Sequence, residues 1–361
     1  DGTGQYGPFI FRTAYTGKFT EEKLIELLAR TEAANAGRFA YRNQPYNILG
    51  VVIERATGMD WKEAFERTIA DPLGLGDTSP SMSRVDRSDL AMPYGVTPDG
   101  FERRPLTKDD ANMHAAGGHV TTVLDMARWI EAFLEDGVVD GERVFPAEVI
   151  EAARSVQVPQ DREFSLFHRH GWGYGWDIGT YDGDTLVHRF GGYTGAYSHV
   201  SFMPEHGIGV VALVNEPALG DRAADGAAAA IYDHLLGKED AAQTRTGFAE
   251  ESRRVAERYR QGIAEELETR AGRQRPMPLA LSGYAGTYVS DQLGTMTWTE
   301  TDDGLEVRAG LVHAPAEVYD AGAHAFRVEL RGGGSVVRFL VEDGEVVGLT
   351  YRGFEFDRTG G

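Results

Sequence analysis

Residues 186–215 read LVHRFGGYTGAYSHVSFMPEHGIGVVALVN, and this stretch decides the fold. Apolar residues dominate 186–190, 200–203 and 208–214, a pattern that predicts three short strands. The tetrapeptide PEHG at 204–207 is typical of a turn and predicts a hairpin between the last two strands. We therefore expect an antiparallel sheet in this part of the chain.

Ahead of that sheet the apolar residues recur at helical spacing. Thr20, Asp60 and Thr122 each stand just before such a run, where helix N-capping residues stand. After the sheet, an Ala-rich segment predicts one more helix over about 223–236. The predicted fold class is α/β (α+β), an antiparallel sheet with a helical block before it and a closing helix after it.

The C-terminal third has a different pattern. Residues 239–275 interleave Arg with Glu, which is typical of a solvated linker helix. From Tyr284 onward short strands recur, and turns are expected at 302–304, 332–334 and 343–344. This predicts a small antiparallel barrel or sandwich. The expected parts are residues 1–238, a helical linker at 239–280, and a small all-β barrel at 281–361.

Composition excludes several classes of function. The 361 residues are 42% hydrophobic and 25% charged, as in soluble globular proteins, and the net charge of −20 disfavours nucleic acid as a partner. No apolar stretch approaches the about 20 residues of a membrane span. The chain has no cysteine, which excludes disulfides and cysteine-bound metal. It begins at Asp1 without a leader, so we expect a processed or trimmed product, secreted or periplasmic, whose address label cannot be read from this sequence.

Three separated segments carry short motifs in a fixed order. They are FAYRN at 39–43, MHAAGG at 113–118 and HRFGG at 188–192 followed by Gly195. Together they resemble the Tyr-x-Asn element, the Ala-Gly-Gly turn and the Lys-Thr-Gly or His-x-Gly strand of the serine β-lactamase and penicillin-binding-protein superfamily, class C-like members included. The tail from 284 is similar to the lipocalin-like barrel that often follows such domains.

The resemblance implies acyl transfer through a serine nucleophile, a base and an oxyanion pocket. By match to the motifs, Tyr41 is the base or proton shuttle, and Asn43 holds the substrate amide or the lysine of the family. Gly191 keeps the strand open for substrate, and the N–H of Gly192 is an oxyanion donor. The plainer alternative for Tyr41 is a tyrosine of the core.

The strand motif departs from the family at its cationic position. Neighbouring residues on a strand face opposite sides, so only one of His188 and Arg189 points into the cleft. Arg189 shares parity with Gly191 and is our choice for the cation, although an arginine cannot accept a proton. His188 and Tyr193 stay as candidate substrate-binding residues, with an outward or packed histidine as the alternative for His188.

The serine motif of the family is missing from the sequence. Its Ser-x-x-Lys places a serine three residues before a lysine. Those positions hold Tyr15, Thr20, Met59, Pro105 and Leu235, which precede Lys18, Lys23, Lys62, Lys108 and Lys238. The pair Thr20 and Lys23 suits a helix start better. The serine segment is therefore a separate polypeptide, is trimmed away, or is lost in a pseudoenzyme, and we favour the first.

The leading hypothesis is a serine hydrolase that cleaves a D-amino-acid peptide, a small ester or a β-lactam through an acyl-enzyme. The competing hypothesis is a non-catalytic protein that keeps the cleft as a ligand-binding site. Expected partners are an N-terminal fragment carrying Ser-x-x-Lys and a small-molecule or peptide substrate, and an oligomer stays open. No cofactor or metal is expected, since the His168–His170 alternation has no acidic cluster beside it.

Overall fold

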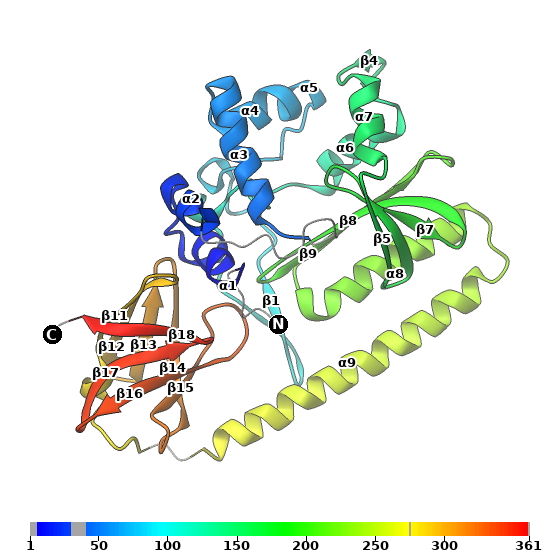
Figure 1. Ribbon diagram of the computed structural model, residues 1–361. Coiled ribbons are helices and arrows are strands. Elements are labelled where there is room, and N and C mark those ends of the chain that lie inside the picture. The colour runs from blue at the N-terminus through cyan, green and yellow to red at the C-terminus, as the bar shows by residue number, and fades with distance from the viewer. Residues whose placement is uncertain (1–5, 30–40, 274–275, 360–361) are drawn as a thin grey trace.

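The computed structural model describes residues 6–29, 41–273 and 276–359. A helix-covered sheet occupies the N-terminal two thirds of the chain, and a closed β-barrel forms its C-terminal end (Figure 1). The long helix α9 (Ala241–Ala271) runs between them. The predicted mixed α/β fold with a small C-terminal barrel is confirmed.

The central sheet has six antiparallel strands in the order β10-β9-β8-β7-β6-β5. Their bounds are β5 (Val158–Phe164), β6 (Phe167–Trp172), β7 (Asp177–Tyr181), β8 (Asp184–Tyr193), β9 (Ala196–Met203) and β10 (Ile208–Val214). The three predicted strands correspond to β8, β9 and β10, and residues 204–207 form the predicted turn. Strands β5, β6 and β7 were not predicted.

Helices cover both faces of the sheet (Figure 1). Helix α8 (Pro217–Leu235) packs its Ala228, Ala229 and Tyr232 on one face, and α6 (Val123–Leu134) packs Ile130 and Phe133 on the other. Val187 of β8 belongs to the α6 cluster, whereas Leu186 belongs to the α8 cluster. Successive β8 residues thus face alternate helices.

Short elements make up the rest of the helical block. They are α1 (Tyr6–Ile10), η1 (Phe11–Thr16), α2 (Glu21–Ala29), α3 (Gln44–Thr57), α4 (Trp61–Phe65), η2 (Glu66–Ala70), α5 (Asp71–Leu73), η3 (Met82–Arg84), η4 (Asp110–Asn112) and α7 (Ala147–Arg154), with the hairpins β1 (Tyr94–Thr97)–β2 (Gly100–Arg103) and β3 (Val138–Val139)–β4 (Glu142–Arg143). The predicted capping residues accept backbone N–H groups: Thr20 from Lys23, Asp60 from Lys62, and Thr122 from Asp125.

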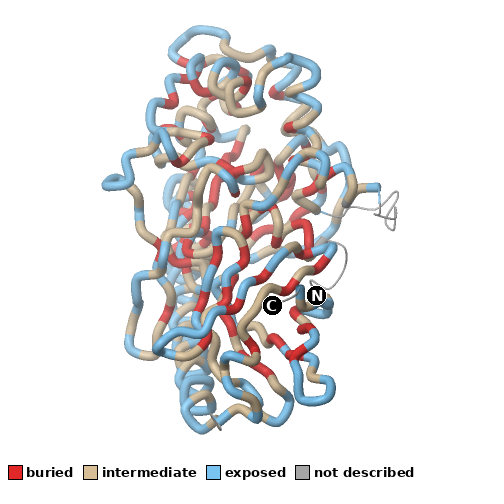
Figure 2. The backbone as a smooth tube through the Cα atoms, turned by 90° about the vertical axis from the view of Figure 1, so that its left-hand side faces the viewer, coloured by how far each residue is buried: buried red, intermediate tan, exposed pale blue. Residues whose placement is uncertain are grey.

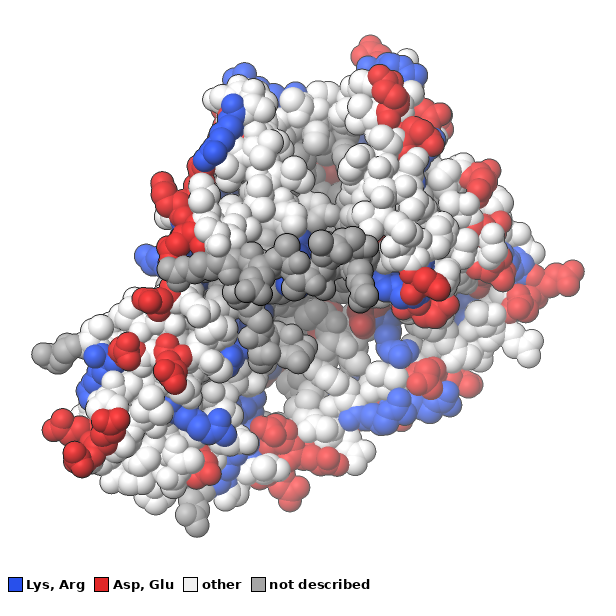
Figure 3. Space-filling view, viewed as in Figure 1, with Lys and Arg blue, Asp and Glu red and all other residues white. Residues whose placement is uncertain are grey.

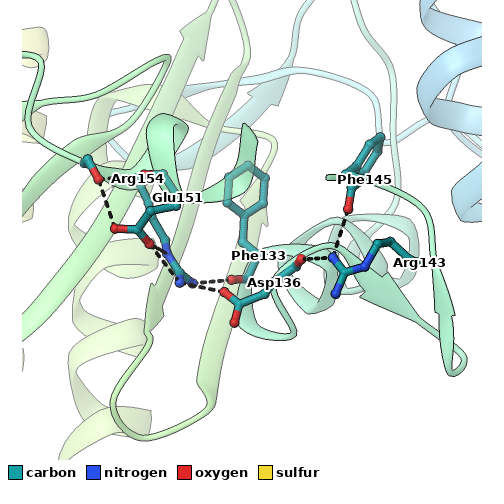
Figure 4. Close-up of polar contacts among 7 residues, drawn as sticks. Phe133, Asp136, Arg143, Phe145, Glu151 and Arg154 are labelled. Carbon is teal, nitrogen blue, oxygen red and sulfur yellow. Dashed lines mark hydrogen bonds and ion pairs between the residues drawn. The ribbon is translucent and has the colours of Figure 1, made fainter. Parts of the chain in front are cut away.

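Arg154 fastens the end of α7 to the end of α6 (Figure 4). Its guanidinium donates to the carbonyl of Phe133 at 2.7 Å and pairs with Asp136 at 2.6 Å and Glu151 at 3.2 Å. The side chain is only 18% exposed, so these partners replace water that it has lost. The contact holds the C-terminal end of α7 beside the C-terminal end of α6.

The barrel closes from β11 to β18. Its strands are β11 (Gly286–Ser290), β12 (Gly294–Thr301), β13 (Gly304–Ala309), β14 (Val312–Asp320), β15 (Ala325–Val328), β16 (Ser335–Glu342), β17 (Glu345–Tyr351) and β18 (Phe354–Thr359), after the short helix α10 (Leu281–Tyr284). Buried residues alternate along these strands (Figure 2). Phe11 of η1 joins the barrel core, 5.7 Å from the Tyr351 ring, so the N-terminal segment docks onto the barrel.

Helix α9 is a charged rod with one buried residue, Ala241. Arg254 and Glu251 pair at i,i+3, as the interleaved charges predicted. Arg and Glu side chains are its charged groups, and both signs of charge appear along its visible face (Figure 3). Within the described residues, no helix combines the length and apolar character that crossing a membrane requires.

Candidate active site

The Tyr41 ring lies where the helical block meets the sheet. It precedes α3, is 39% exposed, and lies 5.6 Å from the Trp172 ring of β6. The Arg189 guanidinium stands over Tyr41 at 4.3 Å and over Trp172 at 4.9 Å. Burial raises the pKa of the adjacent Tyr46, an effect that the positive charge of Arg189 opposes. The structure therefore brings Tyr41, which precedes α3, next to Arg189 of strand β8.

Asp177 anchors Arg189. Its carboxylate is fully buried and lies 3.2 Å from the Arg189 guanidinium, 3.4 Å from that of Arg169 and 3.7 Å from that of Arg162. Gln160 also donates to it at 2.9 Å. The Arg189 guanidinium therefore keeps a fixed position, because moving it away would leave the buried Asp177 carboxylate with too few cationic partners. Asp177 begins β7 and is paired in register with His188, a relation that no local sequence pattern indicates.

One edge of β8 is open beside Arg189. Strand β7 pairs with β8 only from Asp184 to His188, whereas β9 pairs with it as far as Tyr193. From Arg189 to Tyr193 the other edge of β8 has no strand partner among the described residues. Backbone N–H and C=O groups on such an edge are available to an extended ligand. The edge spans about 13 Å, since a strand rises about 3.3 Å per residue.

The two glycines of the strand motif lie on this segment. A Cβ on Gly191 would stand 2.7 Å from the Ser198 hydroxyl of β9, so a larger residue there would require the Ser198 side chain to move. Gly192 is exposed, and a Cβ on it would meet nothing within 4 Å. Tyr41 contacts the strand at Arg189, about 10 Å along it from Gly192. The structure thus places Tyr41, Arg189 and both glycines along one strand edge.

His188 lies apart from these groups. It is 1% exposed, its ring packs 5.2 Å from Phe167, and its Nε2 accepts a hydrogen bond from Arg169 at 3.1 Å. Burial, with Arg169 beside it, holds the pKa of His188 well below its ordinary value. A substrate beside Tyr41 does not reach this buried ring. We therefore leave His188 out of the site and treat it as a packed histidine.

Tyr193 ends the open segment and is held from three sides. Its hydroxyl donates to the carbonyl of Ala14 at 2.8 Å and lies 3.2 Å from the Thr107 hydroxyl. Its ring stacks on Tyr15 at 5.6 Å, and burial raises its pKa to about 12. The Tyr193 side chain is therefore uncharged near pH 7, and it bounds the open β8 edge in a fixed position.

Helix α3 holds the Ala-Gly-Gly turn. Asn47, which is 6% exposed, accepts the backbone N–H of Ala116 at 2.9 Å. Asn43 directly precedes α3, and its carbonyl accepts the N–H of Asn47 at 3.2 Å. The turn and the tyrosine motif are thus tied to the same helix. Asn47 was missed from the sequence, because its partner is 69 residues away.

A family model described as Beta-lactamase matches residues 3–234. The match covers well over half of the chain and includes every motif described above. This chain belongs to the Beta-lactamase family. Its fold resembles the octameric penicillin-binding protein homologue from Pyrococcus abyssi, with a TM-score of 0.54 at 21% identity over 98% of this chain and 74% of that one.

Two curated relatives are similar in sequence. Penicillin-binding protein 4 of Amycolatopsis lactamdurans is 29% identical over 180 residues, covering 49% of this chain and 47% of the relative. Unguisins hydrolase ungD of Aspergillus violaceofuscus is 22% identical over 298 residues, covering 76% of this chain and 51% of the relative. The chain spans about half the length of these curated relatives.

A serine paired with a lysine, as this family's chemistry requires, is not formed by the described residues. Lys23 pairs with Glu26, Lys238 pairs with Asp182, and Lys108 donates to a backbone carbonyl at 3.4 Å. The Ser198 hydroxyl lies beside Gly191, but no hydrogen bond joins it to a His or Lys within the described ranges. Its position follows from the β8–β9 register, which the sequence did not reveal.

A Ser–His–Asp chain exists elsewhere in the sheet. His199 Nδ1 lies 2.8 Å from Asp225, and His199 Nε2 lies 2.7 Å from the Ser201 hydroxyl, which also meets Tyr232 at 2.8 Å. All three residues are at most 2% exposed beneath α8. A nucleophile must reach its substrate, so this chain serves to satisfy buried polar groups. Among residues 6–29, 41–273 and 276–359, no three His, Asp or Glu side chains converge as a metal site.

Proposed function

We propose that this chain is the larger part of a serine hydrolase that cleaves an amide or ester bond through an acyl-enzyme. The nucleophilic serine would come from a polypeptide segment with Ser-x-x-Lys that is not in the 361 residues. The observation that carries the proposal is Tyr41 stacked under Arg189 at 4.3 Å beside an open strand edge with two glycines.

Each group has a defined task in this proposal. The Tyr41 hydroxyl shares the proton of the incoming serine, and the N–H of Gly192 stabilises the oxyanion of the tetrahedral intermediate. Arg189 attracts a substrate carboxylate, and its buried partner Asp177 fixes its position. The substrate backbone lies along the open edge of β8, where Gly191 leaves room for it.

Two uncovered surfaces support a covering segment. Strand β10 pairs only with β9 among the described residues, so its other edge is unpaired. Helix α3 exposes Leu49, Val52 and Ile53, at 52%, 51% and 40%, although helices usually bury such an i, i+3, i+4 stripe. The surface over α3 is mostly uncharged (Figure 3). A strand and a helix of a second segment would cover these surfaces.

The substrate class follows from the names of the relatives and from the residues. One curated relative is a penicillin-binding protein and another a hydrolase of unguisins. Together with the Arg189 cation, they favour a D-amino-acid peptide, a small ester or a β-lactam with a carboxylate. The similar fold from Pyrococcus abyssi is octameric, and an oligomer is part of the proposal.

The kinetic test compares Tyr41→Phe with Tyr174→Phe. Tyr174 is 65% exposed and takes no part in the proposed chemistry, so it controls for loss of a surface hydroxyl. With a chromogenic cephalosporin and a chromogenic ester, Tyr41→Phe should lower kcat about 100-fold or more, and Tyr174→Phe should leave it within twofold. Equal rates in both variants would refute the role of Tyr41.

The competing function is a non-catalytic binding protein. The observation in its favour is that no lysine in the sequence follows a serine at the required spacing. Such a protein would bind a penicillin reversibly, and dialysis would remove the ligand. A covalent adduct that survives denaturation would exclude this function.

A further inference from the structure

Lys108 lies between the Ala-Gly-Gly turn and the end of the open β8 edge. Its Nζ donates to the carbonyl of Gly117 at 3.4 Å and stands 4.1 Å from the centre of the Tyr193 ring. Tyr193 directly follows Gly192, the proposed oxyanion donor. The ammonium group therefore lies next to the place where the proposed chemistry occurs.

The ammonium has no carboxylate partner among the described residues. The two acidic residues nearest in sequence have other hydrogen-bond partners. Asp109 accepts the N–H of Ala111 at 3.2 Å, and Asp110 accepts the N–H of Ser83 at 3.1 Å. An ammonium has three donors, and Gly117 occupies one of them. A half-buried cation in this state gains from any anion that reaches it.

Lys62 places a second positive charge near Lys108. Burial, with Lys62 nearby, lowers the pKa of Lys108 to about 8. The pKa of His114 is lowered to about 4 by burial and then by Lys62 and Lys108. The Nε2 atom of His114 is also enclosed without a hydrogen-bond partner. Lys108 and Lys62 are therefore the cations at this position, whereas His114 is neutral near pH 7 and its Nε2 has no protein partner.

We propose that Lys108 is a specificity-determining residue that binds a carboxylate on the acyl side of the substrate, at the Tyr193 end of the open β8 edge. The inference rests on the proposed hydrolase function and deepens it. Arg189 at one end of the open edge and Lys108 at the other lie on opposite sides of Gly191 and Gly192. The site thus favours substrates with an anionic acyl group over neutral ones of the same length.

Two ester substrates isolate this charge. Mono-p-nitrophenyl succinate and p-nitrophenyl butyrate have the same acyl length, but only the first carries a carboxylate. In the wild type we expect kcat/KM to favour the succinate ester by about tenfold, the typical effect of one charge-assisted hydrogen bond. Lys108→Met should abolish the preference, and Lys108→Arg should retain it within about threefold.

Lys18→Met is the matched control. Lys18 is exposed, and the substitution removes the same unit of charge. If it reduces the preference as much as Lys108→Met does, the effect is general electrostatics and the proposal is overturned. Thermal unfolding of each variant shows that it is folded, and Met suits the half-buried position because it keeps the length of the side chain.

Calorimetric binding of succinate separates this proposal from the hydrolase proposal. If no ester is hydrolysed, the hydrolase proposal fails, yet a roughly tenfold weaker Kd for succinate in Lys108→Met still supports the anion site. If succinate binds wild type and Lys108→Met equally, or binds neither, Lys108 is not an anion receptor. Hydrolysis with no succinate preference would leave the hydrolase intact and overturn the role of Lys108.

Discussion

Asp177→Asn should destabilise the sheet domain strongly. The substitution keeps the shape of the side chain and removes the negative charge that faces Arg189, Arg169 and Arg162 at 3.2, 3.4 and 3.7 Å. Breaking a buried ion pair from one side costs about 3–5 kcal/mol. Arg169 is fully buried, whereas Arg189 and Arg162 are 21% and 44% exposed and regain hydration. We therefore expect a loss of about 3 kcal/mol, the lower end of that range.

Guanidinium and thermal unfolding followed by tryptophan fluorescence measure this loss. Of the 5 tryptophans, only Trp298 lies in the barrel, so the signal reports mainly on the sheet domain. A loss of about 3 kcal/mol corresponds to a Tm lower by about 6–12 °C for a domain of this size. The control is Asp140→Asn, because Asp140 is 71% exposed in its pair with Arg128 and should contribute at most about 1 kcal/mol.

A double-mutant cycle checks the cause. Arg169→Met removes the buried cation, so the double variant with Asp177→Asn should be more stable than the sum of the two single losses predicts. A loss below about 1 kcal/mol for Asp177→Asn, or strict additivity in the cycle, would refute the charge argument.

Three further predictions concern stability. Gly195→Ala should lower the free energy of unfolding by about 2–3 kcal/mol, because φ is +78° there and the new Cβ would stand 1.9 Å from a proline carbon. Gly207→Ala, at φ +64° with open space around it, should lower it by only about 1 kcal/mol. Equal losses for the two variants in denaturant titrations would contradict the clash at Gly195. Since burial holds the pKa of His114 near 4, below the 6.5 of the unfolded chain, the unfolded state binds the proton first as the pH falls. The free energy of unfolding should therefore decrease between about pH 6.5 and 4, and His114→Gln should flatten this part of the profile; an unchanged profile would argue against it. Arg154→Met should lower the free energy of unfolding by about 1–3 kcal/mol by releasing α7, whereas Arg254→Met, at an exposed position, should cause no measurable loss. Equal Tm values for the two variants would show that the contacts in Figure 4 do not stabilise the fold.

The fold was predictable where one side of an element is clearly apolar. Residues 208–214 form β10 as predicted, and Thr122 begins α6 as its position indicated. Strands β5, β6 and β7 were not predicted. In β5 the reason is its largely exposed sequence VPQDREF, whose strand form comes from pairing with β6. Helix α8 begins at Pro217, ahead of the Ala-rich run, since Glu216 caps it by accepting two backbone N–H groups at 2.8 Å.

The site was predictable only at its motif residues. Tyr41 and Arg189 were selected by motif and by strand parity, and the structure places them 4.3 Å apart. Asp177 and Lys108 were not selected, because each reaches the site through pairing or loop packing between distant segments. Sequence patterns report local periodicity, whereas electrostatic partners of this kind depend on the assembled tertiary structure.

Covalent labelling with a fluorescent penicillin, read by intact-mass and peptide mass spectrometry, tests the central claim most directly. We predict a stable adduct on a serine of a second polypeptide segment carrying Ser-x-x-Lys, with sharply reduced labelling in Tyr41→Phe. An adduct on a residue of these 361 amino acids would contradict it.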